Sequence, residues 1–272
     1  MIDYTKKLPK HIDKYIGEND LFLEIYKDKT NDKKPPLLFI HGAYTGSWMW
    51  SKYIPHFVDE GWNCYVMNMR SHYKSRGMDL TKISIADYLD DIREVITECG
   101  EPPVIIGFSM GGILSQKIAE EIKLAGLILI DTTICKEVYE MAPYKSGEMS
   151  LTEEIIEPSP NRDEISSIDE SADDIAFERK YLQMESSKAR NEYGDYEKDG
   201  GISVNNSLVN CPCFTISAVA SEEDDVRGKA TATYFNAQYL GLWNTTHTGL
   251  LVGQRYNEVV VSILKWLGTS LL

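Results

Sequence analysis

The stretch GFSMGG, residues 107–112, decides the fold of this chain of 272 residues. It has the pattern G-x-S-x-G and follows the apolar run 103–106. Apolar residues at helical spacing continue through 113–124, so the context predicts that Ser109 lies on a sharp turn between a strand and a helix. Glycine on both sides of the serine avoids collisions there, because glycine has no Cβ. The same pattern also arises by chance in surface loops, which lack such a context.

Two backbone amides are expected to face Ser109. The helix that begins after the serine directs its positive end toward it. The sequence HGA, residues 41–43, closes a predicted strand at 36–40, and the glycine lets the chain turn so that the next amide faces Ser109. The N–H groups of Ala43 and Met110 are therefore the predicted oxyanion hole. The side chain of His41 need not carry a proton, because its loop contributes amides.

His247 is the predicted general base. It lies in NTTHTG, residues 244–249, between the last predicted strand and the last predicted helix. This places it at the carboxyl edge of the sheet and late in the chain, after both Ser109 and the acid. An imidazole there would take the Ser109 proton and return it to the leaving group.

The acid that orients His247 has several candidates. Asp131 ends the apolar run 127–130, again at a carboxyl edge. Glu222, Asp224 and their acidic neighbours Glu223 and Asp225 follow the predicted strand 213–219. Any of these four could instead cap the helix predicted from residue 226. The residues alone do not decide between them, and the resemblance described below leads us to favour Asp131 slightly, then Glu222, then Asp224.

Strand and helix signals alternate as in a doubly wound, mostly parallel sheet with helices on both faces. The predicted strands are 21–26, 36–40, 63–68, 103–106, 127–130, 213–219 and 238–243, and the predicted helices are 48–61, 83–99, 113–124, 226–237 and 256–267.

Residues 132–210 break this alternation, with only a weak helical pattern at 175–187. We expect residues 1–131 and 211–272 to form the core domain and 132–210 to form a lid over the serine. The alternative is a disordered acidic linker, but the aromatic and apolar side chains near residues 177–184 favour packing.

Charge and cysteine content restrict the partners and the compartment. The net charge of −14 argues against nucleic acid and anionic membranes. Residues 148–199 hold 16 acidic and 6 basic side chains, and by default such a run is a solvated face. No apolar run reaches the roughly 20 residues of a membrane span, and residues 1–7 lack the apolar core of a secretion signal.

Five dispersed cysteines are typical of free thiols in a reducing compartment, so we expect a cytoplasmic protein. The pair Cys211 and Cys213 has no second cysteine pair or histidine cluster beside it. It therefore predicts the start of a buried strand rather than a metal site.

The chain resembles the α/β-hydrolase superfamily over nearly its whole length, and within it the branch of esterases and hydroxynitrile-lyase-like enzymes. The shared features are HGA at 41–43, GSW at 46–48 with Trp50, GFSMGG at 107–112, Glu185-Ser186 shortly before Cys211-Pro212, and His247. The resemblance implies Ser109 as nucleophile, His247 as base, and the amides of Ala43 and Met110 as oxyanion donors.

Two departures from the superfamily pattern matter. The usual Arg-Gly-His-Gly run is replaced by RSHYKS at 70–75, so we expect a reshaped loop there. The usual acid position, counted from Cys211-Pro212, falls on Ser221. Some branches carry the acid at the position of Asp131 instead.

These features together predict a serine carboxylesterase that hydrolyses a small or medium neutral ester through an acyl-enzyme. No metal or organic cofactor is implied, because a triad and an oxyanion hole suffice in this fold. A lactonase, an amidase, a C–C hydrolase and a lyase are alternatives on the same scaffold. A non-catalytic ligand-binding or receptor protein is the alternative from another class.

Overall fold

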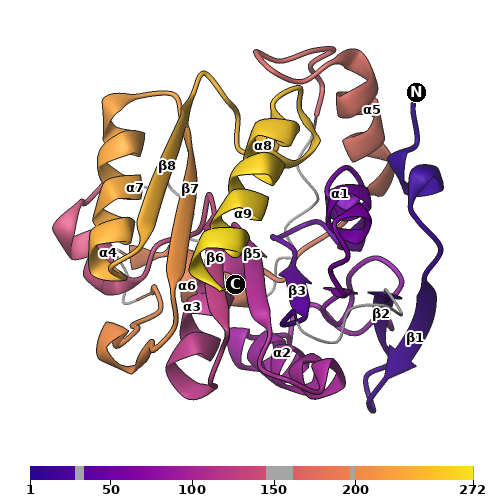
Figure 1. The fold of residues 1–272 in the computed structure, drawn as a ribbon, viewed down its shortest axis with the longest axis horizontal. Coiled ribbons are helices and arrows are strands. Elements are labelled where there is room, and N and C mark those ends of the chain that lie inside the picture. Colours follow the sequence, from indigo (N-terminus) through magenta and orange to yellow (C-terminus); the bar gives the residue numbers. More distant parts are fainter. Residues whose placement is uncertain (28–33, 145–161, 197–199, 272) are drawn as a thin grey trace.

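The protein is an eight-stranded sheet with helices on both faces, seen here in a computed structural model (Figure 1). The structure describes residues 1–27, 34–144, 162–196 and 200–271. The strands are β1 (Ile12–Ile16), β2 (Leu21–Tyr26), β3 (Leu37–Ile40), β4 (Cys64–Met67), β5 (Val104–Phe108), β6 (Gly126–Ile130), β7 (Cys213–Val219) and β8 (Gln238–Trp243).

The strand order is β1-β2-β4-β3-β5-β6-β7-β8. Strands β3 to β8 are parallel to their neighbours among themselves. At one edge of the sheet β2 pairs antiparallel with β4, and β1 pairs antiparallel with β2. Parallel strands end at the same edge of a sheet. The loops after β3, β5, β6 and β8 therefore open on one side, and this is where an open α/β sheet binds its ligands.

The α-helices that the structure describes are α1 (Ile54–Asp59), α2 (Ile85–Cys99), α3 (Met110–Glu121), α4 (Lys136–Met141), α5 (Ala172–Tyr181), α6 (Ser187–Gly194), α7 (Glu222–Tyr234), α8 (Gly249–Val252) and α9 (Tyr256–Ser270). Short 3₁₀ turns are η1 (Tyr4–Lys7), η2 (Ser47–Trp50) and η4 (Asn206–Leu208). None of the described helices is long and apolar enough to cross a membrane.

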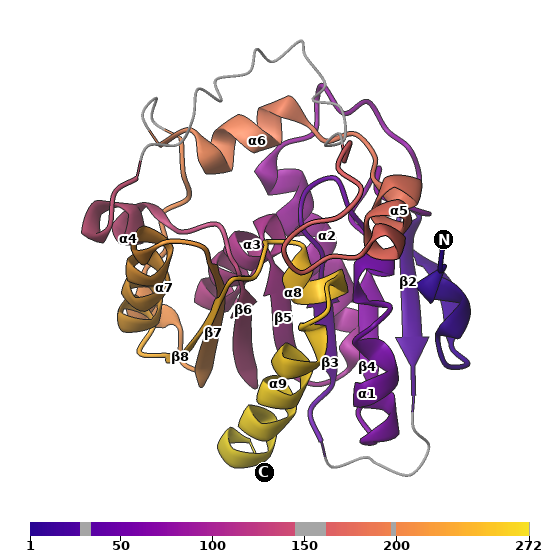
Figure 2. The same cartoon turned by 90° about the horizontal axis from the view of Figure 1, so that it is seen from above.

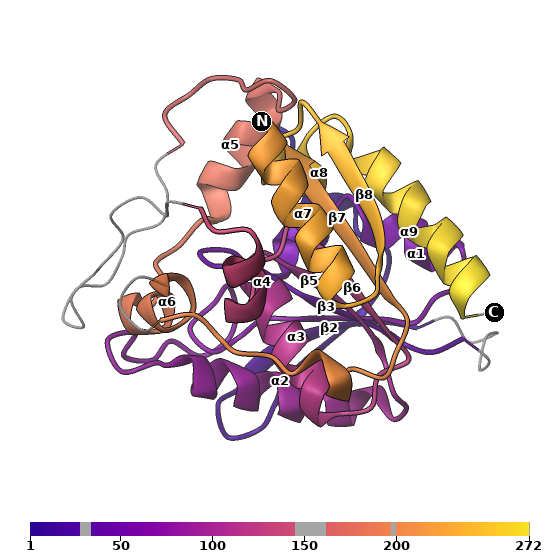
Figure 3. The same ribbon diagram turned by 90° about the vertical axis from the view of Figure 1, so that its left-hand side faces the viewer.

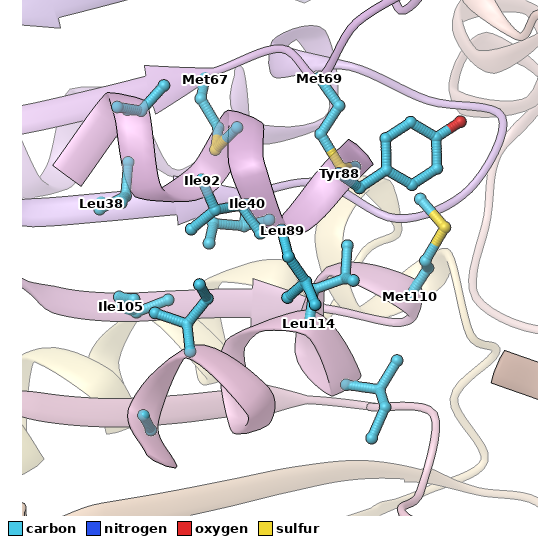
Figure 4. Close-up of a cluster of buried hydrophobic side chains, with 14 of the residues drawn as sticks. Leu38, Ile40, Met67, Met69, Tyr88, Leu89, Ile92, Ile105, Met110 and Leu114 are labelled. Atoms are coloured by element: carbon cyan, nitrogen blue, oxygen red, sulfur yellow. The ribbon is translucent and has the colours of Figure 1, made fainter. Parts of the chain in front are cut away.

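Each face of the sheet has its own core, because successive side chains of a strand point to opposite faces. Leu38 and Ile40 pack with α2 and α3, and Figure 4 shows this cluster together with Met110. Leu37 and Phe39 pack on the other face with η2, α1 and α9. Figure 3 shows the sheet between α2 and α3 on one side and α1 and α9 on the other. The expected doubly wound fold is confirmed.

Several predicted boundaries are wrong for identifiable reasons. The single helix expected at 48–61 is a 3₁₀ turn followed by α1, because Pro55 lies in the first turn of α1 and lacks the N–H that a continuous helix needs. Helix α7 begins at Glu222 rather than 226, since Ser221 and Asp224 form a capping box. The edge strand β1 was not predicted, because four of its five residues are exposed and give no core pattern.

The segment between β6 and β7 contains α4, α5 and α6. Figure 2 shows α5 and α6 beyond the end of the parallel strands at which α3 begins. The expected weak helix at 175–187 is instead α5, which ends at Tyr181, followed by α6 from Ser187. Part of the acidic stretch lies outside the described residues. The division into a core and a lid domain stays a prediction.

Candidate active site

Ser109 lies on a strained turn between β5 and α3. Its backbone has φ 54° and ψ −120°, a region that a residue with a side chain rarely adopts. The turn is fixed on both sides. The Ser109 N–H donates to Ile130 O at 3.1 Å, and Ser109 O accepts from Gly112 N at 2.9 Å. Strain of this kind persists only where surrounding contacts determine it, and it is concentrated at functional sites.

The two glycines of the G-x-S-x-G pattern allow this turn. A Cβ on Gly107 would lie 2.4 Å from Ser115 Oγ, and one on Gly111 would lie 2.4 Å from the carbonyl oxygen of His41. Contacts this short force the neighbouring atoms apart. The collision expected from the sequence is therefore present at both positions.

His247 and Asp131 meet at the carboxyl edge of the sheet. The Nδ1 of His247 is 2.5 Å from Oδ2 of Asp131, and the ring stacks on Phe108 at a centroid distance of 4.5 Å. Asp131 is itself held by β7, since its N–H donates to Ile216 O at 2.7 Å and its Oδ1 accepts from Ala218 N at 3.0 Å. With its proton on Nδ1, the imidazole presents the Nε2 lone pair for general-base work.

The other acid candidates lie elsewhere. Asp224 Oδ2 accepts from the N–H and the hydroxyl of Ser221, both at 2.9 Å, and Asp224 also pairs with Arg227. Asp224 thus takes part in the N-terminal cap of α7, which is the structural role that the sequence offered as the alternative for these acids. Glu222 is exposed in that same turn. Neither carboxylate is bonded to His247 among the residues that the structure describes.

Ser109, Asp131 and His247 line one cavity of about 640 Å³. Its walls combine apolar side chains such as Ile134 and Ile216 with several hydroxyl groups. His247 is 47% exposed and Asp131 is 22% exposed, so the pair is open to the cavity. Ser109 Oγ has no hydrogen-bond partner within the described ranges. Catalytic hydrogen bonds often form only when substrate is bound.

The loop after β3 passes close to Ser109. A Cβ on Gly42 would lie 2.9 Å from the Cβ of Ser109, so this glycine permits the approach and brings half-buried Ala43 beside the turn. Met110 is the first residue of α3, where N–H groups have no partner within the helix. The assignment of these two amides as the oxyanion hole stays a prediction.

His41 has a structural environment. It is fully buried, its Nδ1–H donates to Gly42 O at 2.8 Å, and its Nε2 accepts from Met69 N at 3.1 Å. Burial and the neighbouring His72 lower the pKa of His41 to about 3. A neutral ring with both nitrogens occupied ties its loop to the chain after β4.

The loop 70–75 keeps a glycine-like backbone without glycine. Ser71 has φ 63° and Tyr73 has φ 49°, both in the left-handed region that favours glycine. The side chain of Gln183 bridges the two, accepting from Tyr73 N and donating to Ser71 O, each at 2.7 Å. The reshaping expected from the missing glycines is therefore not seen in the backbone conformation at these two positions.

A buried ion pair links this loop to the segment before α6. His72 Nε2 is 3.0 Å from Oε2 of Glu185, and both side chains are fully buried. Burial alone would lower the pKa of His72, but the Glu185 carboxylate raises it above its usual value. Burial likewise opposes ionisation of Glu185, yet His72 and hydrogen bonds from the Tyr88 hydroxyl and the Ser186 N–H lower its pKa. Each partner therefore favours the charged form of the other.

One group of metal-ligand side chains occurs among the described residues. It comprises His11, Asp13 and Glu24, whose ligand atoms lie within 4.8 Å of one another. It is on β1, β2 and the residue before β1, at the edge of the sheet away from Ser109. His11 and Lys74 approach Asp13 at 3.1 Å and 4.0 Å, and the Tyr26 hydroxyl donates to Glu24 at 3.3 Å, so all three side chains have partners within the protein.

Several acidic side chains in the segment 162–196 are buried, which the sequence did not predict. The acidic run was expected to be a solvated face, which is wrong for Asp169, Glu170, Asp174, Glu178 and Glu185, all buried. Their partners lie up to 170 positions away along the chain, so no local pattern identifies most of them. Local signals exist for two of them, in the S-x-x-D pair of Ser171 with Asp174 and the S-x-x-E pair of Ser167 with Glu170.

Comparison with known proteins agrees with this architecture. Residues 35–154 match the family model described as the alpha/beta hydrolase fold. No curated protein sequence matches the chain. The chain has the α/β-hydrolase fold.

Solved structures with the same fold include several hydrolases. A carboxylesterase of Nitrososphaera gargenis is 18% identical, with a TM-score of 0.67 over 94% of this chain and 99% of that one. A monoacylglycerol lipase of Paleococcus ferrophilus is 16% identical, with a TM-score of 0.67 over 91% and 98%. The enol-lactonase of Burkholderia xenovorans is 14% identical, with a TM-score of 0.66 over 94% and 100%. At these identities the similarity is one of fold.

Proposed function

We propose that this protein is a serine hydrolase that cleaves carboxylic esters. The observation that carries the proposal is the 2.5 Å contact between His247 Nδ1 and Asp131 Oδ2 at a cavity that Ser109 also lines. A nucleophile, a base and an orienting acid at one carboxyl edge are the parts that acyl transfer requires. The order Ser109, Asp131, His247 along the chain is that of α/β-hydrolases.

In this mechanism His247 Nε2 takes the Ser109 proton as Oγ attacks the ester carbonyl. The amides of Ala43 and Met110 stabilise the resulting oxyanion, assisted by the positive end of α3. His247 then protonates the leaving alcohol, and the acyl group remains on Ser109 Oγ. A water molecule, deprotonated by the same imidazole, releases the acid and restores Ser109.

The proposed substrate is a small or medium neutral ester. A cavity of about 640 Å³ lies within the range of pockets for small molecules. The excess of carboxylates in residues 148–199 disfavours anionic substrates. The five cysteines are free thiols, which supports the proposal of a cytoplasmic protein.

We further propose that residues 132–210 form a lid over a core of residues 1–131 and 211–272. Contacts from this segment to the loop beside Ser109 support the assignment. Gln183 N donates to Tyr44 O at 3.0 Å, and Arg190 donates to the Tyr44 hydroxyl at 2.8 Å.

A panel of p-nitrophenyl esters of rising acyl length tests the activity, with wild type and Ser109→Ala side by side. Labelling by a fluorophosphonate probe tests whether Ser109 is an activated nucleophile. We expect hydrolysis of short esters and labelling in the wild type only. A wild type that neither turns over nor is labelled would point instead to a ligand-binding protein on this fold. Turnover of a lactone in preference to every open-chain ester would point to a lactonase.

A further inference from the structure

The buried acids of residues 162–196 differ in how their charges are compensated. Acidic side chains are rarely buried without a partner charge. Glu185 pairs with His72, Asp174 pairs with Lys52, and Glu170 pairs with Arg162, which Glu178 also contacts. Asp169 is 3% exposed and forms no ion pair with any residue that the structure describes. Hydrogen bonds, rather than a partner charge, therefore stabilise its buried carboxyl group.

Asp169 binds the residue directly before His247. Its Oδ2 accepts from the N–H of Thr246 at 3.1 Å and its Oδ1 accepts from the Thr246 hydroxyl at 2.8 Å. Gly249 packs so closely that a Cβ there would lie 2.2 Å from Asp169 Oδ2. The loop that carries His247 is folded tightly around this carboxylate.

Neighbouring contacts hold the other side of His247. Glu170 Oε1 accepts from the hydroxyl of Thr248 at 2.6 Å. The carbonyl of Asp169 accepts from Gln254 N at 2.7 Å. The residues before and after His247 are thus both bound to the acidic pair 169–170.

Glu185 makes the equivalent contact at the loop that carries Ala43. Its Oε2 accepts from the N–H of Tyr44, the residue directly after Ala43, at 3.4 Å. The carboxylate is itself fixed by His72 and by the Tyr88 hydroxyl at 2.5 Å. Two buried acids of one segment therefore bind the backbone next to the proposed base and next to a proposed oxyanion amide.

We propose that Asp169 and Glu185 are positioning residues, which hold the His247 loop and the Ala43 loop at the distance from Ser109 that acyl transfer needs. This rests on the proposed function. A displacement of about 1 Å at a reacting group can cost about 100-fold in rate, and carboxylates that accept backbone N–H groups are well suited to fixing a loop. The segment then contributes to the rate as well as covering the site.

The test compares Asp169→Asn and Glu185→Gln with Asp174→Asn. Asp174 is equally buried in the same segment, but it binds Lys52 and neither loop. We expect kcat on a p-nitrophenyl ester to fall about 10- to 100-fold in the first two variants, with KM nearly unchanged. The Asp174 variant should lose thermal stability while keeping its kcat. Equal kcat losses in all three variants would overturn the proposal.

Hydrogen exchange gives a readout that does not depend on activity. Asp169→Asn should accelerate exchange of the Thr246 amide and leave the Tyr44 amide protected, and Glu185→Gln should do the reverse. Thr246→Val removes the hydroxyl bond to Asp169, and Tyr88→Phe removes the hydroxyl bond to Glu185. These two variants replace the acid variants if those do not fold. Unchanged amide protection would overturn the positioning role, whereas an inactive, unlabelled wild type with these exchange changes would overturn only the ester chemistry.

Discussion

Asp131 Oδ2 lies 2.5 Å from His247 Nδ1, although the two residues are 116 positions apart in the chain. Asp131 takes this position because it follows β6 with φ 40°, which turns its side chain toward the end of β7. His247 reaches it from the loop after β8, two strands along the sheet. The contact depends on the strand order, and it fixes which imidazole nitrogen faces the cavity.

The first prediction concerns the nucleophile. Ser109→Ala should abolish ester hydrolysis while the unfolding temperature changes little. Loss of a triad nucleophile costs on the order of 10⁶ in kcat. Initial rates on the best p-nitrophenyl ester measure the effect, and circular dichroism controls for folding. More than about a tenth of wild-type activity in the variant would contradict a serine mechanism.

The second prediction separates two histidines. His247→Ala should be nearly as damaging as Ser109→Ala, because nucleophile and base act as one unit and their losses do not add. His41→Ala should act on stability, by about 1–3 kcal/mol, since it leaves the buried Met69 N–H without its acceptor. Rates and urea unfolding of both variants measure these effects. Loss of turnover in the His41 variant alone would reassign the base.

The third prediction identifies the acid. Asp131→Asn should reduce kcat by about 10⁴-fold, because an amide favours the wrong imidazole tautomer. Asp224→Asn should cost about 1 kcal/mol of stability and little activity, since that carboxylate caps α7. Glu222→Gln, at an exposed position, should change neither. An Asp131 variant that keeps full activity, beside an inactive Glu222 or Asp224 variant, would overturn the assignment.

The fourth prediction concerns pH and stability. Burial and the neighbouring Glu170 carboxylate, opposed by Arg162, together raise the pKa of Glu178 to about 9. The unfolded chain releases this proton near the ordinary value of 4.5, so the folded state loses stability as pH rises from about 4.5 to about 9. Glu178→Gln removes this loss, and its stability advantage over wild type should grow across that interval.

Thermal unfolding at pH 5, 7 and 9 checks this prediction. Glu164→Gln is the control, because Glu164 also binds Arg162, at 2.7 Å, but is largely exposed. Its difference from wild type should stay small. A Glu178→Gln variant less stable than wild type at pH 9 would show that the buried carboxyl is ionised and needed there.

The sequence identifies some parts of this site better than others. Ser109 and His247 follow from local patterns, since a glycine-flanked serine after a strand and a late histidine after the last strand fix their own positions. The identity of the acid stayed open because Glu222 and Asp224 follow the carboxyl end of a second strand, β7, at the same edge of the sheet. The capping box formed by Ser221 and Asp224 was a local signal that would have favoured Asp131.

The two buried positioning residues could not be predicted from local patterns. Asp169 and Glu185 lie in an acidic stretch whose composition indicates exposure, and their bonds to Thr246 and Tyr44 span 77 and 141 positions of the chain. Residues 71 and 73 are a second case in which a distant side chain fixes what the local sequence does not predict. The missing glycines suggested a different loop, yet bonds from Gln183 hold Ser71 and Tyr73 in left-handed conformations.

The exposure of His247 bears on how each turnover would end. With 47% of its side chain accessible, the imidazole is in contact with solvent in the part of the chain that the structure describes. An acyl group on Ser109 would face water, whose concentration far exceeds that of any acceptor alcohol. The protein would then release a free carboxylic acid and would be a poor catalyst of transesterification.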